Sequence, residues 1–122
     1  MNNFFIINIL CSLTAVTSNY LFKTIFDQKL NWNNSIYIFL IDIFKTLMTP
    51  LSIIAVIVFI SSNLIWFYIL STQKFSLSFP LHISLVFVFS YLISNIFLGE
   101  ILEIKNVFAL FLIGIGILIL TK

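Results

Sequence analysis

Residues 51–70 read LSIIAVIVFISSNLIWFYIL and contain no Asp, Glu, Lys or Arg. A helix of about 20 apolar residues is as long as the hydrocarbon core of a bilayer is thick, about 30 Å. Residues 4–22 and 79–98 are charge-free runs of the same kind. The three runs predict helices that cross a membrane.

A fourth apolar run, residues 105–120, is close to the lower limit of about 17 residues for a membrane span. It can reach across the bilayer if it stands upright, or if Ile101–Ile104 joins it and the Glu103 side chain extends to the surface. The connections expected at 71–78 and 99–104 are short, which predicts antiparallel neighbours. The sequence therefore predicts an all-α integral membrane protein, a four-transmembrane-helix bundle forming one domain over residues 1–122.

The composition supports a membrane location and excludes several functions. Of the 122 residues, 61% are hydrophobic and 8% charged, and the mean hydropathy is +1.20, whereas soluble domains are about 45–50% apolar. The net charge of +2 is too small and dispersed for a nucleic-acid partner. A single cysteine, Cys11, allows neither a disulfide framework nor a zinc cluster within one chain. We expect no metal and no cofactor.

The N-terminal run could also be a signal peptide. No Lys or Arg precedes it, and it is longer than the apolar part of a typical signal. We expect it to be retained as a membrane helix.

The connection between the first two spans predicts a helix on the membrane surface. Residues 36–47 are apolar except for Asp42 and Lys45, which share one helical face at a spacing of three. Trp32 and Tyr37 are the aromatic anchors expected at headgroup level. After this interfacial helix, Thr49-Pro50 predicts an N-cap and the first position of the next helix.

Small and polar residues recur at helical spacing in the first run. Asn8, Ser12, Ala15, Asn19 and Lys23 are separated by four, three, four and four residues and so share a face. Unpaired amides are costly in lipid, which predicts that this polar stripe faces protein or a water-filled cavity. Two interpretations stay open: a seam for helix packing, and the polar wall of a substrate path that ends at Lys23.

The second and third runs add polar and aromatic residues that we assign to the same path. They are Asn63, Trp66, Tyr91 and Asn95. Asn63 and Trp66 are three apart, and such a pair forms a pocket wall or, more commonly, an interhelical contact. His82 is a candidate for gating or proton relay, although an isolated histidine at a helix end more often only donates a hydrogen bond.

The last part of the sequence contains no pattern typical of a catalytic site, so we expect no enzymatic activity. Glu100, Glu103 and Lys105 have no His, Cys or further carboxylate placed to orient a nucleophile, and no G-x-S-x-G elbow occurs. In the fourth run, Ala109 and Gly116 are seven apart and form one small-residue face. This face predicts a dimer seam or, alternatively, packing within one chain.

Four spans in about 120 residues, with FLGE at 97–100 and LIGIGILIL at 112–120, resemble the drug/metabolite transporter superfamily. The size is similar to that of the small multidrug resistance proteins and of the related subunits that flip undecaprenyl-phosphate-linked aminoarabinose. The multidrug exporters use a buried glutamate eight residues before a lysine. Matching that lysine to Lys23 puts Ala15 in the glutamate's place, so the proton-coupling residue of those exporters is missing.

The lipid-flippase subunits resemble this chain more closely. They lack that glutamate, enter their third helix with Ala-Tyr-Pro where this chain has Ser78-Phe79-Pro80, and carry a turn carboxylate matched by Glu100. The resemblance implies a flippase subunit of the bacterial inner membrane, a homodimer or a heterodimer with a similar four-span protein. It would translocate a polyisoprenyl-phosphate-linked sugar, with Lys23 attracting the phosphate. The alternatives are an exporter of cationic compounds and a non-transporting partner of a membrane glycosyltransferase.

Overall fold

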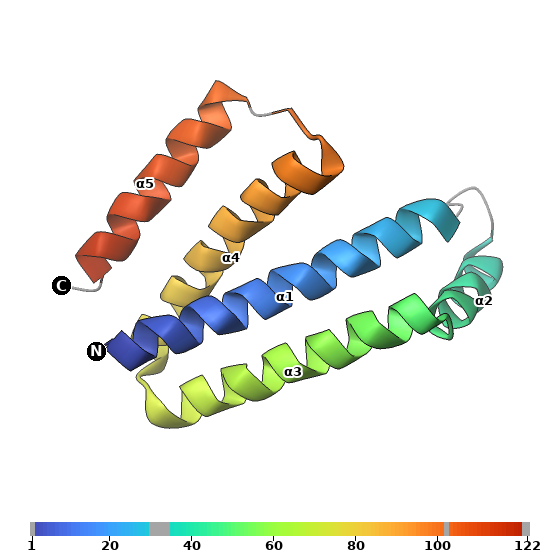
Figure 1. Ribbon diagram of the computed structural model, residues 1–122, viewed down its shortest axis with the longest axis horizontal. Coiled ribbons are helices and arrows are strands. Elements are labelled where there is room, and N and C mark those ends of the chain that lie inside the picture. Colours follow the sequence, from blue (N-terminus) through green and yellow to red (C-terminus); the bar gives the residue numbers. More distant parts are fainter. Residues whose placement is uncertain (1, 30–34, 102, 121–122) are drawn as a thin grey trace.

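The computed structural model describes residues 2–29, 35–101 and 103–120, and the regular structure within these ranges is helical. The helices are α1 (Asn2–Lys29), α2 (Ile36–Leu47), α3 (Pro50–Thr72), α4 (Phe75–Leu98) and α5 (Ile104–Leu120) (Figure 1). Three of them, α1, α3 and α4, are long and apolar enough to cross a membrane. An all-helical fold with several helices of membrane length is thus confirmed. α5 is apolar but has only 17 residues, and the fourth span stays a prediction.

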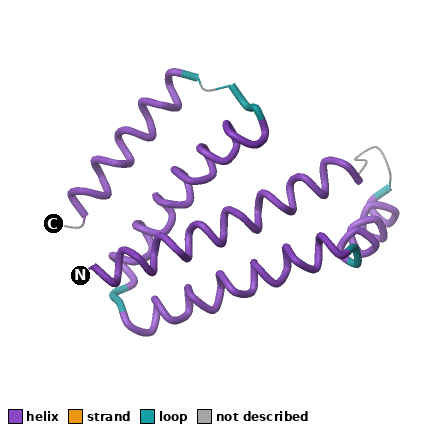
Figure 2. The backbone as a smooth tube through the Cα atoms, in the orientation of Figure 1, coloured by secondary structure: helices purple, strands orange, loops and turns teal. Residues whose placement is uncertain are grey.

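The centre of the fold is α1. It lies between α3 and α4 and packs along both of them, whereas α3 and α4 contact each other little (Figures 1 and 2). Among the described residues, α5 contacts only α4. The chain therefore forms a bundle around its first helix, with α5 attached at one side, and not a ring of sequential neighbours.

Small and polar residues join α1 to α3. Cys11 and Ser18 of α1 and Ala55 of α3 are fully buried. The Ser18 hydroxyl donates to the Ala55 carbonyl at 3.1 Å, and the Ser62 hydroxyl donates to the Cys11 carbonyl at 3.1 Å. Small side chains let two backbones approach closely, and interhelical hydrogen bonds add attraction where lipid offers none. Packing of α1 against α3 thus depends on these few residues.

α1 is longer than its charge-free run. It continues past Phe22 to Lys29, because no proline or glycine follows to end the helix. Lys23 and Asp27 are one turn apart in this extension, and their charged atoms lie 3.6 Å apart. Helical pairs of this spacing stabilise the added turns.

α4 begins earlier than predicted. The expected loop over 71–78 is wrong, because only Gln73 and Lys74 separate α3 from α4. The Lys74 carbonyl accepts the backbone N–H groups of Leu77 at 3.1 Å and Ser78 at 3.0 Å, so the new helix starts at once. Pro80 therefore lies inside α4 and does not mark its first turn.

A helix over residues 36–47 is present as expected, at the end of the bundle where α1 ends and α3 begins (Figure 1). Thr49 is the N-cap residue of α3 and Pro50 its first residue, also as expected. The Thr49 side chain, however, makes no capping hydrogen bond to a backbone N–H of α3. Its hydroxyl donates to the Thr46 carbonyl at 2.8 Å and lies 2.8 Å from Ser52 Oγ. Trp32 lies outside the described residues, and the placement of α2 on a membrane surface stays a prediction.

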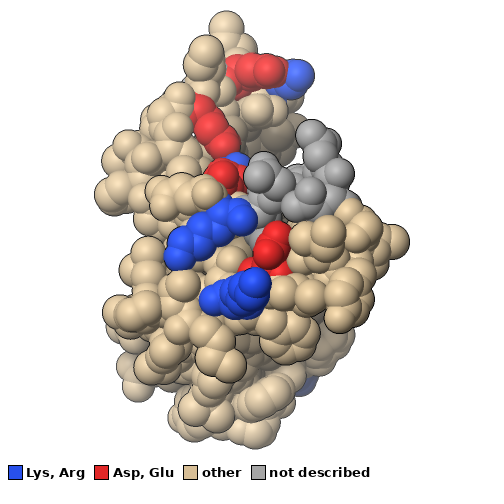
Figure 3. Space-filling view, turned by 90° about the vertical axis from the view of Figure 1, so that its right-hand side faces the viewer, with Lys and Arg blue, Asp and Glu red and all other residues tan. Residues whose placement is uncertain are grey.

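Charged side chains gather at one end of the molecule, which we call the charged end (Figure 3). It comprises the end of α1, α2 and the connection between α4 and α5. Its charged residues are Lys23, Asp27, Lys29, Asp42, Lys45, Glu100, Glu103 and Lys105. Lys74, between α3 and α4, lies at the opposite end. The bundle is therefore polar at one end and nearly uncharged over the rest of its described length.

Candidate binding cavities

A cavity of about 260 Å³, the central cavity, lies between α1, α3 and α4. Its lining residues are Ala15, Asn19, Phe59, Ser62, Asn63, Trp66, Phe79 and His82. Four of these, Asn19, Asn63, Trp66 and His82, were singled out from the sequence as path or gating residues. The fold brings them together from three helices. No charged side chain is among the described residues that line this cavity.

The His82 side chain is held from two sides. Its ring stacks on the Trp66 ring with the centroids 4.6 Å apart. The Ser12 hydroxyl oxygen lies 3.0 Å from His82 Nδ1 and 3.4 Å from the His82 carbonyl oxygen. Contacts from α1 and α3 therefore fix the imidazole at the cavity wall.

Two amides of the central cavity have unused hydrogen-bonding groups. Asn63 donates its Nδ2 to the Phe59 carbonyl at 2.8 Å, within α3, and its Oδ1 has no partner among the described residues. The Asn19 side chain makes no hydrogen bond to any described residue and is exposed. Amides can both donate and accept, so these groups suit a polar, uncharged ligand.

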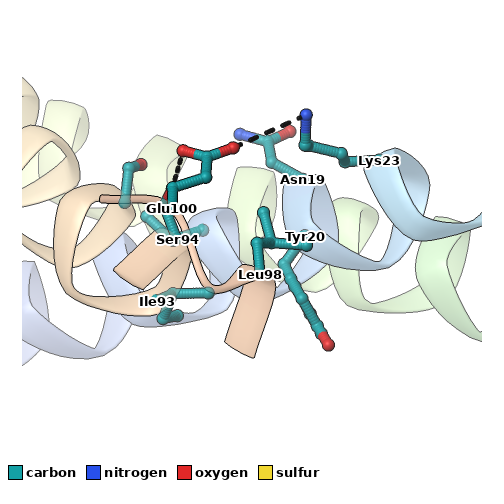
Figure 4. Close-up of a pocket in the computed structure, with 9 residues that line it drawn as sticks. Asn19, Tyr20, Lys23, Ile93, Ser94, Leu98 and Glu100 are labelled. Carbon is teal, nitrogen blue, oxygen red and sulfur yellow. Dashed lines mark hydrogen bonds and ion pairs between the residues drawn. The ribbon is translucent and has the colours of Figure 1, made fainter. Parts of the chain in front are cut away.

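A second cavity, the end cavity, has a volume of about 210 Å³ and lies between α1 and α4 towards the charged end (Figure 4). Its lining residues are Val16, Asn19, Tyr20, Lys23, Ser90, Ile93, Ser94, Leu98 and Glu100. Asn19 lines both cavities, so the two adjoin at this amide. A line of polar groups thus runs from the middle of the bundle to Lys23.

Lys23 is paired with two carboxylates at the rim of the end cavity. Its Nζ lies 3.8 Å from Glu100 Oε1 and 3.6 Å from Asp27 Oδ2. Figure 4 shows the Glu100 carboxylate between Lys23 and Ser94, whose hydroxyl donates to Oε2. A phosphate would compete with these two carboxylates for Lys23, and the predicted attraction of phosphate stays a prediction.

The turn after α4 positions Glu100. α4 ends at Gly99, whose φ of 66° is in the left-handed region that glycine adopts without a Cβ clash. The Glu100 N–H donates to the Ser94 carbonyl at 3.3 Å. Asn95 Nδ2 donates to the Glu100 carbonyl at 2.9 Å. Asn95, which we assigned to the substrate path, thus holds this turn and lines neither cavity.

The polar stripe of α1 has two parts. Asn8 and Ser12 are fully buried, as in a packing seam. Asn8 Nδ2 donates to the Phe4 carbonyl at 3.0 Å, and Asn8 Oδ1 has no partner among the described residues. Ala15, Asn19 and Lys23 instead line the cavities. The first part of the stripe is thus a packing seam and the second part borders the cavities, where a substrate path stays a prediction.

Three further predicted residues lie away from both cavities. Tyr91 is not among the lining residues, and its buried hydroxyl has no hydrogen-bond partner within the described part of the chain. Ala109 and Gly116 are exposed on α5, and a Cβ added at Gly116 would meet no atom within 4 Å. Ala109 and Gly116 are thus not buried against any described part of the chain, and the dimer seam stays a prediction.

Sequence reasoning missed several lining residues. Ser90 and Ser94 interrupt an apolar run at a spacing of four, which is the signal that identified the stripe of α1. The same rule applied to α4 would have found them. Phe59 and Phe79 are two of 15 phenylalanines, and nothing in the sequence distinguishes them from the other thirteen.

The chain has no match among known protein-family models, and no curated protein or solved structure is significantly similar to it. The resemblance to drug/metabolite transporters therefore stays a prediction from its motifs. In the described ranges, no group of three His, Cys, Asp or Glu side chains is placed to hold a metal ion.

Proposed function

We propose that the protein is a small transporter or flippase subunit of the bacterial inner membrane, which translocates a polyisoprenyl-phosphate-linked sugar or a related amphiphile. The observation that carries this proposal is the central cavity. It brings together two amides with unused hydrogen-bonding groups, Asn19 and Asn63, in the middle parts of two helices of membrane length. Polar groups at that depth are costly unless they pack or serve a ligand.

The lining chemistry favours an uncharged sugar as the group that enters the central cavity. Sugar hydroxyls donate and accept hydrogen bonds, as the two amides do. Trp66 and Phe79 supply aromatic surface, and ligand pockets typically combine such surface with a few polar groups. A cation would meet no carboxylate among the described lining residues, which disfavours export of cationic compounds.

The adjoining end cavity connects the central cavity to the charged end of the bundle. Asn19 joins it to the central cavity, and Lys23 and Glu100 lie at its rim. In this mechanism the headgroup follows the polar line along α1 while the lipid tail remains in the bilayer. Only three helices surround the central cavity, so a second copy or a similar four-span subunit would complete its wall.

The proposed membrane placement follows from helix length and charge. α1, α3, α4 and α5 cross the bilayer, and α2 lies on its surface with apolar residues such as Ile36 and Phe44 exposed. Four lysines lie at the charged end and Lys74 at the other. The positive-inside rule then assigns the charged end to the cytoplasm.

Headgroup translocation in reconstituted vesicles tests the function. The probe is a polyprenyl-phosphate hexose whose outer-leaflet sugars are counted with a soluble lectin. Asn19→Leu and Asn63→Leu should each slow translocation about tenfold, the equivalent of one strong hydrogen bond. Asn106→Leu is the matched control, since Asn106 lies on α5 and lines neither cavity.

Unchanged translocation in both cavity variants would remove the assignment. Absence of translocation by the wild-type protein, together with export of a cationic dye, would establish the drug exporter instead. Co-purification with a membrane glycosyltransferase, without transport of either probe, would establish the accessory role.

A further inference from the structure

A third hollow, which we call the basic hollow, lies at the charged end between the end of α1, α2 and the start of α3. Its volume is about 320 Å³. The lining residues are Lys29, Asp42, Lys45, Thr46 and Thr49. It shares no lining residue with the central or end cavity. The proposed transport path therefore leaves this hollow unexplained.

The lysines of the charged end fall into two classes. Lys23 and Lys105 are ion-paired, Lys23 with two carboxylates and Lys105 with Glu103. Lys29 and Lys45 have no carboxylate within 4 Å in the part of the chain that the structure describes. Unneutralised positive charge is thus concentrated at the basic hollow.

One carboxylate shares the basic hollow with these lysines. Asp42 lines it without forming an ion pair to a described residue, so the lining has two positive charges and one negative charge. The Thr49 hydroxyl donates to the Thr46 carbonyl at 2.8 Å, so its proton is already used. The strongest attraction for a ligand in this hollow therefore comes from the two ammonium groups, which attract anions.

We propose that the basic hollow binds the phosphate group of an anionic phospholipid of the surrounding membrane. Ammonium groups bind phosphate as point charges, and basic residues near a membrane surface attract anionic headgroups. Lys29 is the last residue of α1, and Pro50 is the first residue of α3. In the membrane placement proposed above, the hollow consequently lies at headgroup level.

The surroundings favour a lipid over free phosphate. α2 forms one wall of the hollow, and its other faces expose large apolar side chains, with Ile36 80% and Phe44 68% exposed. An acyl chain can cover such surface, whereas free phosphate cannot. The lipid would also link α2, which supplies Lys45, to α1, which supplies Lys29. The inference uses the proposed placement of α2 but not the transport activity.

Native mass spectrometry of the full-length protein in detergent tests this site. The added probes are phosphatidylglycerol and, as a zwitterionic reference, phosphatidylcholine. The wild-type protein should prefer phosphatidylglycerol, and Lys29→Gln/Lys45→Gln should reduce that preference about 25-fold, or fivefold per lysine. The double variant Lys74→Gln/Lys105→Gln removes the same number of charges and, as the matched control, should retain the wild-type preference.

Asp42→Asn provides a test in which the expected result is a gain of affinity. A loss of folding cannot produce such a gain. Removing the one carboxylate of the hollow should raise the affinity for phosphatidylglycerol severalfold. Retention of the preference in the Lys29→Gln/Lys45→Gln variant would overturn the proposal, as would an equal loss in the control or no gain in Asp42→Asn. Displacement of phosphatidylglycerol by millimolar inorganic phosphate would show a site for free phosphate and would overturn the lipid assignment.

The outcomes are separable from those of the transport assay. Failure of phosphatidylglycerol binding leaves translocation by the wild-type protein intact. Failure of translocation leaves the lysine dependence of lipid binding intact, because the two experiments change different residues.

Discussion

α1 and α5 are both apolar helices, yet they have opposite places in the fold. α5 has no polar or charged side chain from Val107 to Ile119, and none of its described side chains is buried. α1 carries Asn8, Ser12 and Ser18, all fully buried, and lies at the centre. Lipid competes equally well for apolar side chains, so apolarity alone does not draw a helix inward. Small and polar contacts decide which helix is central.

The largest expected effect comes from enlarging a buried residue of α1. Ser18 is fully buried, and its hydroxyl contacts the Ala55 backbone at 3.1 Å, so Ser18→Leu would force α1 and α3 apart. We expect the free energy of unfolding to fall by about 1–3 kcal/mol. Unfolding by a denaturing detergent in mixed micelles measures this change.

Thr17→Leu is the control for this substitution. Thr17 is the preceding residue and is exposed, with its hydroxyl bonded to the Leu13 carbonyl of its own helix. Its replacement should leave the unfolding free energy nearly unchanged. Equal effects of the two substitutions would contradict the central place of α1.

A smaller effect is expected when one interhelical hydrogen bond is removed. Ser62→Ala deletes the bond from the Ser62 hydroxyl to the Cys11 carbonyl. Hydrogen bonds between membrane helices average about 0.6 kcal/mol, with a maximum near 1.7 kcal/mol, and we expect a loss in this range. Ser61→Ala, next in sequence, removes only a bond within α3 to Ile57 and should cost less in the same unfolding assay.

The smallest effect on folding is expected in α5. Gly116 is exposed, and a Cβ added there meets no atom within 4 Å. Gly116→Leu should therefore not lower the unfolding free energy, and its better helix propensity should raise it by up to about 1 kcal/mol. If Ala109 and Gly116 form the dimer seam, the same substitution abolishes cross-linked dimers. Gly114→Leu, on a different face of α5, should leave the dimers intact. Persistence of dimers in the Gly116 variant would argue against the seam.

Much of the helical layout could be predicted from sequence, because charge-free length alone indicates a helix that suits a bilayer. The centrality of α1 could not, since it depends on pairings between distant residues such as Ser18 with Ala55. The start of α4 was predicted at Phe79, whereas the helix begins at Phe75, directly after the short connection at Gln73 and Lys74. Sequence pattern finds apolar segments, but it does not identify the neighbours of each one.

The same contrast holds for the candidate site, where the sequence indicates individual residues but not which of them meet. Asn63, Trp66 and His82 each stood out as polar or aromatic residues in apolar runs, but their meeting at one cavity required the relative placement of three helices. The role of Asn95 was not predictable, because its partner is a backbone carbonyl beyond the left-handed turn at Gly99.

The buried polar face of α1 has a consequence for biosynthesis. The hydrogen-bonding partners of Ser18, Cys11 and Ser12 lie 37, 51 and 70 residues further along the chain. At about 5–20 residues per second, the ribosome adds His82 roughly 4–14 s after Ser12. During that interval the polar groups of α1 cannot reach their final partners. Until the later helices arrive, these polar groups need other hydrogen-bond partners, such as water or the carbonyl groups of α1 itself.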